Sequence, residues 1–294
     1  MASSFSGTGR IWVNGELFSP AEARVPVMGH GYLYGDGVFE TLRTYGGIPF
    51  RLEAHLDRLK IALATIRIDA APSPEELAAS FAVTLKAAGL AESYCRITVS
   101  RGVGEGLDPR TCGPPTVVIA VLPLSAYPDA AYTSGITGTF LWPRARGDMP
   151  PPSVKTTSYQ RTVLARLTLA DRGAGEGFFL DEEGNATEGT VSNLFMVKGG
   201  SLVTPHEDVC LAGITRAEVL AIARTSGIIV EEGTISRKAI SEADEVFVTS
   251  SLAELLPVTR IDERRVGSGA PGPMHAALLT EYRARTSAFA AGRR

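Results

Sequence analysis

The chain has 294 residues, of which 44% are hydrophobic and 21% are charged, and its formal net charge is −3. This balance is ordinary for a globular protein, and it gives no reason to expect a nucleic acid or an anionic membrane as a partner. The sequence contains no apolar run of about 18 residues, so we expect no membrane-spanning helix.

The first part of the chain alternates strands and helices. An Asn-Gly pair at 14–15 favours a tight hairpin turn, and the segment Ser73-Pro74-Glu75-Glu76 is a capping box that starts a helix. Leucines spaced by three and four residues predict another helix, and glycines bend the chain before a strand. The expected elements are a hairpin at 10–18, strand 38–44, helices 52–66 and 73–88, and strands 94–100 and 116–122 around a glycine-rich loop at 101–115.

Residues 123–135 contain two prolines and no clear periodicity, which favours a linker between domains 1–122 and 136–294. Four prolines in 143–153 exclude a helix there. Beyond the linker the pattern predicts strand 136–142, helix 159–172, strand 177–181, a hairpin of 191–197 with 201–204, helix 214–226, strands 228–231 and 245–249, and helix 272–290.

Two neighbouring features of the segment 188–216 suit one ligand. Glu188 is a carboxylate between a turn and an apolar run, and Leu211-Ala212-Gly213-Ile214-Thr215 leads into a predicted helix. The amides at a helix start lack intrahelical partners and lie at the positive end of the helix dipole, so they bind anions. A carboxylate for a ring nitrogen beside amides for a phosphate suits pyridoxal phosphate, which also needs a lysine for its Schiff base.

The same residues carry a resemblance. The spacing Glu-x-Thr-x-x-Asn-Leu-Phe from Glu188, followed by Leu202-x-Thr204 and Leu211-Ala212-Gly213-Ile214-Thr215-Arg216, resembles the signature of class IV aminotransferases, the fold type IV pyridoxal phosphate enzymes. The resemblance implies an α/β fold with a small N-terminal domain, a larger pseudo-barrel domain, and the cofactor between them. It also implies a homodimer in which the partner completes each site.

Five lysines could form the Schiff base: Lys60, Lys86, Lys155, Lys198 and Lys238. Lys155 follows the proline-rich stretch and precedes a helix, and the resemblance places the family's lysine upstream of the glutamate motif by about this distance. It would hold the cofactor and move the proton between the substrate Cα and the cofactor C4′. Tyr159 resembles the tyrosine that bonds the cofactor's 3′-oxygen, although its offset from Lys155 is one residue shorter than in branched-chain enzymes.

The other cofactor contacts follow from the same resemblance. Glu188 would keep the pyridine nitrogen protonated. Leu211, Ile214 and Thr215 belong to the cradle for the phosphate, which Ile214 and Thr215 bond through their amides and Thr215 also through its hydroxyl. Arg51 matches the family's phosphate arginine, whose fork suits two oxygens. Ser251 aligns with a phosphate-bonding hydroxyl, and its alternative role is a helix N-cap. His55 reads as a structural residue on a helix.

The expected substrate is an amino donor with a 2-oxo acid as acceptor. Tyr34, Phe39 and Arg43 fall where the family lines its substrate pocket. Arg101 is the first candidate for binding the substrate carboxylate and Arg96 is the second, while a surface ion pair remains the alternative for each. The glycines around Arg101 suggest a mobile clamp of the kind that D-selective relatives use, so we expect D-amino acids or (R)-amines to be preferred.

Three other functions compete. The sequence has Phe39-Glu40 and Arg43 in common with branched-chain L-amino acid aminotransferases, but carries Thr41 where they have glycine. Aminodeoxychorismate lyase has a similar Arg-Gly-x-Gly loop, but it carries a threonine at the position of Glu40. A non-catalytic scaffold that binds pyridoxal phosphate is disfavoured because every expected cofactor residue is present. Three scattered cysteines show no metal-binding spacing and favour a reducing, cytoplasmic compartment, so we expect no metal site.

Overall fold

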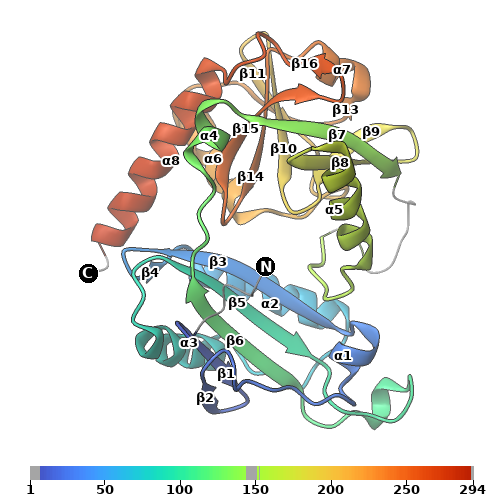
Figure 1. The fold of residues 1–294 in the computed structure, drawn as a ribbon, viewed down its shortest axis with the longest axis vertical. Coiled ribbons are helices and arrows are strands. Elements are labelled where there is room, and N and C mark those ends of the chain that lie inside the picture. Colours follow the sequence, from blue (N-terminus) through green and yellow to red (C-terminus); the bar gives the residue numbers. More distant parts are fainter. Residues whose placement is uncertain (1–6, 144–150, 152, 293–294) are drawn as a thin grey trace. The chain divides into compact units, whose positions relative to one another are not determined.

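The computed structural model describes residues 7–143, 151 and 153–292, which form two compact units (Figure 1). The N-terminal unit comprises the described parts of Met1–Ser125, Val154–Tyr159 and Thr286–Arg294. The C-terminal unit comprises those of Ala126–Ser153 and Gln160–Arg285. Two described segments that are distant in sequence, 154–159 and 286–292, are therefore part of the N-terminal unit. The predicted domains 1–122 and 136–294 stay a prediction.

The N-terminal unit is built on an antiparallel sheet with the strand order β2-β1-β6-β5-β3-β4. In β5, inward and outward residues alternate strictly, as expected for a strand with one buried face. The strands are β1 (Arg10–Val13), β2 (Glu16–Phe18), β3 (Gly37–Tyr45), β4 (Ile48–Pro49), β5 (Ser93–Ser100) and β6 (Thr116–Pro123), and the helices are α1 (His30–Tyr34), α2 (Leu52–Thr65), α3 (Pro74–Ala88) and a 3₁₀ turn at Pro109–Thr111.

Helices α2 and α3 cover the buried face of this sheet. Their apolar side chains, such as Leu59 and Phe81, share one core with Leu42, Ile97 and Ile119 from the strands. Helix α3 starts at the predicted capping box, in which Ser73 and Glu76 bond each other's backbone amides. The core thereby fixes β3, the strand that carries several of the predicted site residues.

The C-terminal unit contains a mixed, curved sheet whose main order is β12-β11-β10-β14-β15-β7-β8-β9-β13, with β16 paired to β15 (Figure 1). The strands are β7 (Ile136–Pro143), β8 (Glu176–Leu180), β9 (Asn185–Gly189), β10 (Asn193–Lys198), β11 (Ser201–Thr204), β12 (Val230–Glu232), β13 (Ile235–Ser236), β14 (Glu245–Ser250), β15 (Glu254–Ile261) and β16 (Arg264–Arg265). The helices are α4 (Asp129–Thr133), α5 (Gln160–Arg172), α6 (Ile214–Thr225), α7 (Arg237–Ser241) and α8 (Pro273–Ala291), whose last residues belong to the N-terminal unit.

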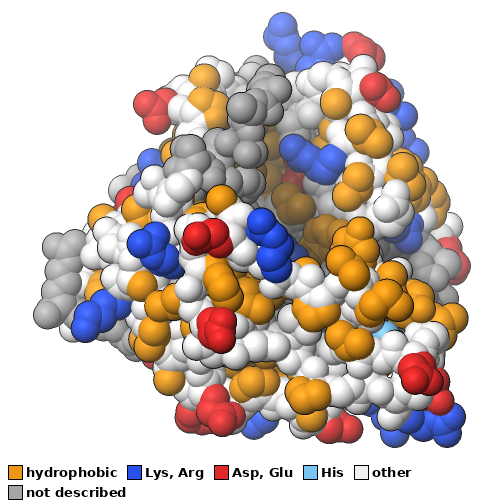
Figure 2. Space-filling view, turned by 60° about the horizontal axis from the view of Figure 1, so that its bottom comes forward, with side chains coloured by type: hydrophobic (Ala, Val, Ile, Leu, Met, Phe, Trp, Pro, Cys, Tyr) orange, Lys and Arg blue, Asp and Glu red, His pale blue; other side chains and the backbone are white. Residues whose placement is uncertain are grey.

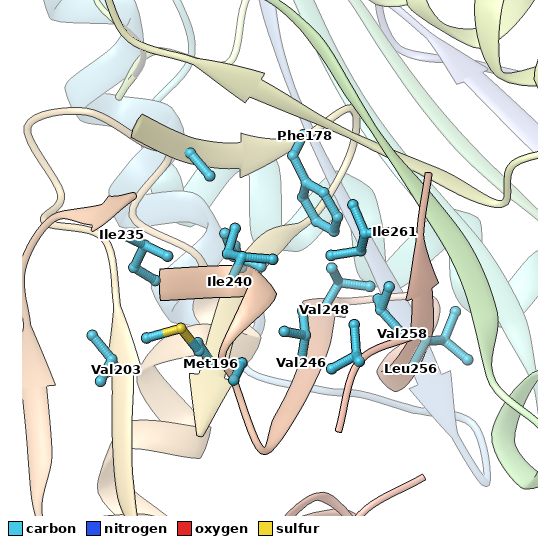
Figure 3. Packing of buried hydrophobic residues seen from close by; sticks show 14 of the residues in the cluster. Phe178, Met196, Val203, Ile235, Ile240, Val246, Val248, Leu256, Val258 and Ile261 are labelled. Atoms are coloured by element: carbon cyan, nitrogen blue, oxygen red, sulfur yellow. The ribbon is translucent and has the colours of Figure 1, made fainter. Parts of the chain in front are cut away.

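The interior of the curved sheet is filled by aliphatic and aromatic side chains. Figure 3 shows Phe178 of β8, Val248 of β14, and Val258 and Ile261 of β15 converging in this core. All five residues of β8 are buried, as expected for a strand covered on both faces. The strand ends that carry candidate site residues are therefore anchored in a packed core.

Most predicted elements are confirmed, including the hairpin at 10–18, both N-terminal helices, the hairpin of β10 with β11, and α6. Several are missing from the prediction. The expected linker contains α4. The elements β9, β13, β16, α1 and α7 were not predicted, because short elements carry too few residues for a periodic signal. The eight-residue strand β15 was also not predicted. Residues 144–150 and 152 of the proline-rich stretch lie outside the described residues. No helix in the described part of the chain is long and apolar enough to cross a membrane.

Candidate functional site

Lys155 lies in a short extended segment of the N-terminal unit, beside the start of β3. Its carbonyl accepts a hydrogen bond from the amide of Phe39 at 2.9 Å, and the amide of Thr157 donates to the carbonyl of Gly37 at 2.8 Å. The side chain of Val154 packs against the core of the same unit. The backbone of Lys155 is thus fixed by the edge of β3, so its side chain starts from a rigid base.

The amino group of Lys155 meets two aromatic side chains. Its Nζ donates to the hydroxyl of Tyr159 at 3.2 Å and lies 4.7 Å from the ring centroid of Phe39. The rings of Phe39 and Tyr159 pack edge to face, with their centroids 5.1 Å apart. The structure therefore brings together the lysine, the tyrosine and the phenylalanine that were predicted from separate parts of the sequence.

Arg96 joins this cluster. Its guanidinium carbon lies 3.6 Å from the ring centroid of Phe39, and its Nε donates to Thr98 Oγ1 at 3.1 Å. Strand pairing sets Thr41 opposite Arg96 and Phe39 opposite Thr98, so these four side chains share one face of the sheet. The second candidate for the substrate carboxylate therefore packs on the same Phe39 ring as the amino group of Lys155.

Arg101, the first candidate, has other partners. Its Nε and Nη2 donate to the carboxylate of Asp36 at 2.6 and 3.0 Å, and its guanidinium also donates to the carbonyls of Arg67 and Ile66 at 2.8 Å each. Burial alone raises the pKa of Asp36, but its bonds to Arg101 and His30 bring that pKa below its usual value. The structure holds Arg101 in a bidentate ion pair, in contrast to the expected mobile clamp.

Arg43 and Tyr34 also have partners outside the cluster around Lys155, Tyr159 and Phe39. Arg43 donates to Glu92 at 2.9 Å, and its guanidinium lies 4.4 Å from the ring centroid of Tyr45. Tyr34 ends α1 with 42% of its surface exposed, and its ring packs against His30. Their roles toward substrate stay predictions.

Behind Phe39, a buried charge network includes Glu40, His55 and Arg58. Glu40 is 1% exposed; its carboxylate bonds His55 Nδ1 at 2.7 Å and accepts two hydrogen bonds from Arg58, each 2.7 Å long. Burial on its own raises the pKa of Glu40, but the charge and hydrogen bonds of Arg58, aided by His55, lower it to about 2. Burial lowers the pKa of His55. His55 therefore has the structural role expected from the sequence, with Glu40 as its partner.

Arg51 adopts a left-handed backbone conformation, with φ of 54°, at the N-cap of α2. Such a conformation is uncommon for a residue with a side chain and is often retained for function. The guanidinium carbon lies 5.6 Å from the ring centroids of both Phe50 and Phe289. The rings and the backbone conformation together fix where the guanidinium lies, which is what an anion-binding arginine requires.

In the C-terminal unit, Glu188 lies near the end of β9, a strand that was not predicted between the expected turn and the apolar run. Its side chain is buried, and Oε2 accepts a hydrogen bond from the amide of Leu211 at 3.0 Å. Asn193 Nδ2 donates to the carbonyl of Leu211 at 2.7 Å. Leu211 is thus held through both its amide and its carbonyl, and it links Glu188 to the segment that starts α6.

Helix α6 begins at Ile214 with Gly213 as its N-cap, and no side chain caps this end among the described residues. A Cβ on Gly213 would lie 1.9 Å from Asn193 Oδ1, so only glycine fits there. The first-turn amides, including those of Ile214 and Thr215, lack intrahelical partners, and the dipole makes this end attractive to anions. This cradle fits a phosphate group, as the sequence predicted.

The turn after β14 corrects one expectation. Ser251 was considered as a helix N-cap, but no helix starts here; residues 251–253 form a turn, and the hydroxyl of Ser250 accepts from the amide of Ala253 at 3.2 Å. Ser251 is therefore not the capping residue. Nearby, Thr249 Oγ1 is buried and has no hydrogen-bond partner among the described residues.

Sequence reasoning missed Glu176. This carboxylate is 4% exposed and accepts hydrogen bonds from the amide and hydroxyl of Thr190, at 3.0 and 2.5 Å, and from the hydroxyl of Ser192 at 2.7 Å. A Cβ on Gly189 would lie 2.1 Å from Ser192 Oγ. Glu176 thus fixes the turn that directly follows Glu188. In the sequence, Glu176 is a single acidic residue before an apolar strand. This pattern is so common that it could not identify Glu176 as a site residue.

Arg216 is a second residue whose role the sequence did not reveal. It is fully buried in the first turns of α6 and donates to Glu207, Glu232 and the carbonyl of Pro205, at 2.8 Å each. A buried guanidinium needs such partners, since an unpaired buried charge is very unfavourable. Arg216 therefore anchors the helix end that forms the anion cradle.

The donor set fits pyridoxal phosphate. The N-terminal unit provides an amine beside aromatic rings and a fixed arginine, and the C-terminal unit provides a buried carboxylate and a glycine-dependent amide cradle. These are the groups that the ring nitrogen, aldehyde and phosphate of this cofactor require.

Comparison with known proteins agrees with this chemistry. The family model described as amino-transferase class IV matches residues 37–261. A putative branched-chain-amino-acid aminotransferase of Methanocaldococcus jannaschii is 37% identical over 278 residues, 93% of this chain and 95% of the relative. The Escherichia coli branched-chain-amino-acid aminotransferase is 35% identical, covering 90% of this chain and 88% of the relative.

Solved structures that are similar to this chain also belong to pyridoxal phosphate enzymes of this kind. The T.th. branched-chain amino acid aminotransferase with pyridoxamine 5′-phosphate has a TM-score of 0.90 and 32% identity, covering 98% of this chain and 95% of that one. The 4-amino-4-deoxychorismate lyase of Pseudomonas aeruginosa has a TM-score of 0.80 and 30% identity, covering 93% of this chain and 98% of that one. These matches confirm the α/β fold of type IV enzymes, and the chain belongs to the class IV aminotransferase family.

Proposed function

We propose that this pyridoxal phosphate-dependent aminotransferase moves the amino group of a branched-chain L-amino acid to a 2-oxo acid such as 2-oxoglutarate. The observation that carries the proposal is the agreement of similar proteins, which are named branched-chain aminotransferases and match almost the whole chain at 35–37% identity. The partners are therefore small molecules.

The preference for D-amino acids or (R)-amines predicted from the sequence loses its main argument. It rested on Arg101 as a mobile clamp for the substrate carboxylate, yet Arg101 is paired with Asp36 and two backbone carbonyls. A substrate carboxylate would have to displace a carboxylate already bound in a bidentate pair, which is the strong form of this interaction. Arg96 requires no such displacement, so we propose it as the carboxylate-binding arginine.

We propose that residues of both units serve one cofactor molecule, which supplies an electron sink for the bond electrons at the substrate Cα. Lys155 would hold the cofactor covalently and then carry the proton between Cα and C4′, a transfer that its position beside Tyr159 supports. Tyr159 would bond the cofactor's 3′-oxygen. Glu188 would keep the ring nitrogen protonated, because a carboxylate at hydrogen-bond distance favours the charged ring.

The phosphate would be bound by the amides of Ile214 and Thr215, the hydroxyls of Thr215 and Ser251, and the guanidinium of Arg51. The uncapped start of α6 and the fixed backbone of Arg51 support these roles, because an anion site works best when its donors are already in place. Phe39, with Tyr34 and Arg43 as further candidates, would line the substrate pocket.

The lyase remains the second candidate because a solved lyase is similar to this chain over almost its whole length. The state of Glu40 argues against it. The resemblance places a threonine that assists proton transfer in the lyase at this position, whereas Glu40 is buried and bonded to His55 and Arg58 through both oxygens. A carboxylate held in this way has no free oxygen for proton transfer to substrate.

We also propose that the chain forms a homodimer. The N-terminal unit exposes large apolar side chains on two adjoining segments, with Val27, Met28, Tyr32 and Leu107 each more than half exposed. Figure 2 shows hydrophobic side chains gathered at this surface. Monomers rarely expose large apolar patches, so we propose that a second copy of the chain covers this surface.

We further propose a reducing compartment such as the cytoplasm, because all three cysteines are free thiols.

Steady-state rates with 2-oxoglutarate as acceptor test the substrate proposal. L-leucine should give the highest kcat/KM, above D-alanine and (R)-1-phenylethylamine. A clear preference for either of the latter would contradict the proposal, and pyruvate release from aminodeoxychorismate without an acceptor would favour the lyase.

Light scattering tests the proposed dimer. The wild type should have twice the mass of one chain, and the double variant Leu107→Lys with Tyr32→Lys should associate more weakly.

A further inference from the structure

A histidine and a cysteine in the N-terminal unit form a pair that the proposed reaction does not use. His30, the first residue of α1, is 2% exposed, and Cys112 follows the 3₁₀ turn in the glycine-rich loop. His30 Nδ1 bonds the carboxylate of Asp36 at 3.2 Å. Because the carboxylate of Asp36 already accepts two hydrogen bonds from Arg101, it is the acceptor here as well, and Nδ1 carries the proton.

This assignment leaves a lone pair on His30 Nε2. That atom is buried and has no hydrogen-bond partner among the described residues. A buried acceptor without a partner is destabilising relative to a satisfied one, so the arrangement needs an explanation. A carboxylate on one imidazole nitrogen with the other nitrogen free is the usual arrangement of a histidine that binds a metal ion.

Gly104 shows what this nitrogen faces. A Cβ on Gly104 would lie 3.1 Å from His30 Nε2, 2.5 Å from Cys112 Sγ and 3.1 Å from Thr111 Oγ1. The imidazole nitrogen and the thiol therefore border the same small space, which exists because residue 104 has no side chain. The Thr111 hydroxyl is already occupied, since it accepts from the amide of Glu105 and donates to the carbonyl of Asp108, each at 2.8 Å.

We propose that His30 Nε2 and Cys112 Sγ bind one soft monovalent metal ion, of which Cu⁺ is the representative. The described residues contain no group of three or more His, Cys, Asp or Glu side chains arranged for a metal ion, so a site here has two protein ligands. Thiolate and imidazole ligands suit Cu⁺, whereas Zn²⁺ prefers four ligands and Mg²⁺ prefers oxygen.

Charge supports the choice of a monovalent ion. Binding would release the thiol proton to solvent, and one thiolate with one Cu⁺ is neutral, so the site gains no net charge beside the Asp36–Arg101 ion pair. The bound ion would join α1 to the loop that contains Cys112.

The test uses the enzyme with its cofactor bound, anaerobically, with Cu⁺ supplied from a coloured chelator that competes for it. The wild type should take one tightly bound Cu⁺ per chain, with release of one proton. Cys112→Ser and His30→Gln should each lower the affinity at least about 10-fold, as loss of a ligand or its support does. Gly104→Ala should do the same by filling the space, although both ligands remain.

Gly113→Ala is the matched control, because a Cβ there meets only one atom, at 3.9 Å, in the same loop. It should bind Cu⁺ like the wild type. Cu⁺ should also protect Cys112 from iodoacetamide in the wild type but not in His30→Gln; Cys95 and Cys210 are buried and should stay unmodified throughout. Wild-type affinity in Cys112→Ser or Gly104→Ala, or no Cu⁺ binding by the wild type, would overturn the proposal.

Discussion

The two units prepare their parts of the candidate site in different ways. In the N-terminal unit, side chains hold one another: Glu40 is bound by His55 and Arg58, and Asp36 is bound by Arg101 and His30. In the C-terminal unit, buried Glu176 and Arg216 hold backbone segments, which position the carboxylate of Glu188 and the backbone amides at the start of α6. The difference suggests that the N-terminal unit depends on charge pairs, whereas the C-terminal unit depends on the position of its main chain.

The largest effect should come from Lys155→Ala in the N-terminal unit. Because the proposed covalent attachment and the proton carrier are lost together, turnover should fall by at least ~10³-fold, and the long-wavelength absorbance of the bound cofactor should disappear. The measurement is steady-state kinetics with an absorbance spectrum. Lys198→Ala, at the exposed end of β10, is the control and should behave like the wild type. A borohydride-reducible cofactor adduct on another lysine would contradict the assignment.

Arg58→Met tests the dependence of the N-terminal unit on charge pairs. It leaves Glu40 buried without its main partner, and breaking a buried ion pair in this way costs about 3–5 kcal/mol of stability. A lower midpoint in urea unfolding should be visible. Arg110→Met removes an exposed partner of Asp108 in the same unit and should leave the midpoint unchanged.

The pH dependence of unfolding adds a second measurement on this network. The pKa of Glu40 is lowered from its ordinary 4.5 to about 2, so its contribution to stability is complete above 4.5 and is lost as pH falls toward 2. The lowered pKa of His55 acts in the same direction: the unfolded chain takes up a proton below about pH 6.5 more readily than the folded one. An acid midpoint that did not change in Glu40→Gln would contradict this account.

Glu188→Gln tests the C-terminal unit. The amide keeps the shape and can still accept from Leu211, so the main chain should stay in place and the cofactor should still bind. The charge opposite the ring nitrogen is lost, and turnover should fall by on the order of 10²-fold. Glu183→Gln, on an exposed turn, serves as the control. Normal turnover with full cofactor content would mean that Glu188 does not contact the ring.

The smallest predicted effect concerns substrate selection. Thr41 shares the sheet face of Phe39 and Arg96, at a position where the resemblance places glycine in branched-chain enzymes. Thr41→Gly should raise kcat/KM for L-leucine relative to L-alanine by about 10-fold, because small changes in pocket volume have effects of this size. Thr41→Val keeps the volume and should retain the wild-type ratio. An equal change in both variants would exclude the steric explanation.

Elements and groups whose signals are local could be predicted from the amino-acid sequence. The hairpin at 10–18 follows from Asn14-Gly15, α3 follows from its capping box, and the anion cradle follows from the glycine before α6, because turn, cap and helix-end chemistry involve residues only a few positions apart. The motif from Glu188 to Arg216 lies within one continuous stretch, which is why it revealed the family.

Contacts between side chains that are distant in sequence became visible only in the three-dimensional structure. Arg101 bonds Asp36 across 65 residues, and this pairing replaces the mobile clamp expected from its glycine neighbours. Arg96 and Lys155 meet at Phe39 because strand pairing and the edge of β3 bring three distant segments together. Glu176 has a role only because β8 lies beside β9. Such contacts depend on strand register and on how the strands connect, and no local sequence pattern encodes either. The partners of a charged residue could therefore not be predicted from its neighbours in sequence.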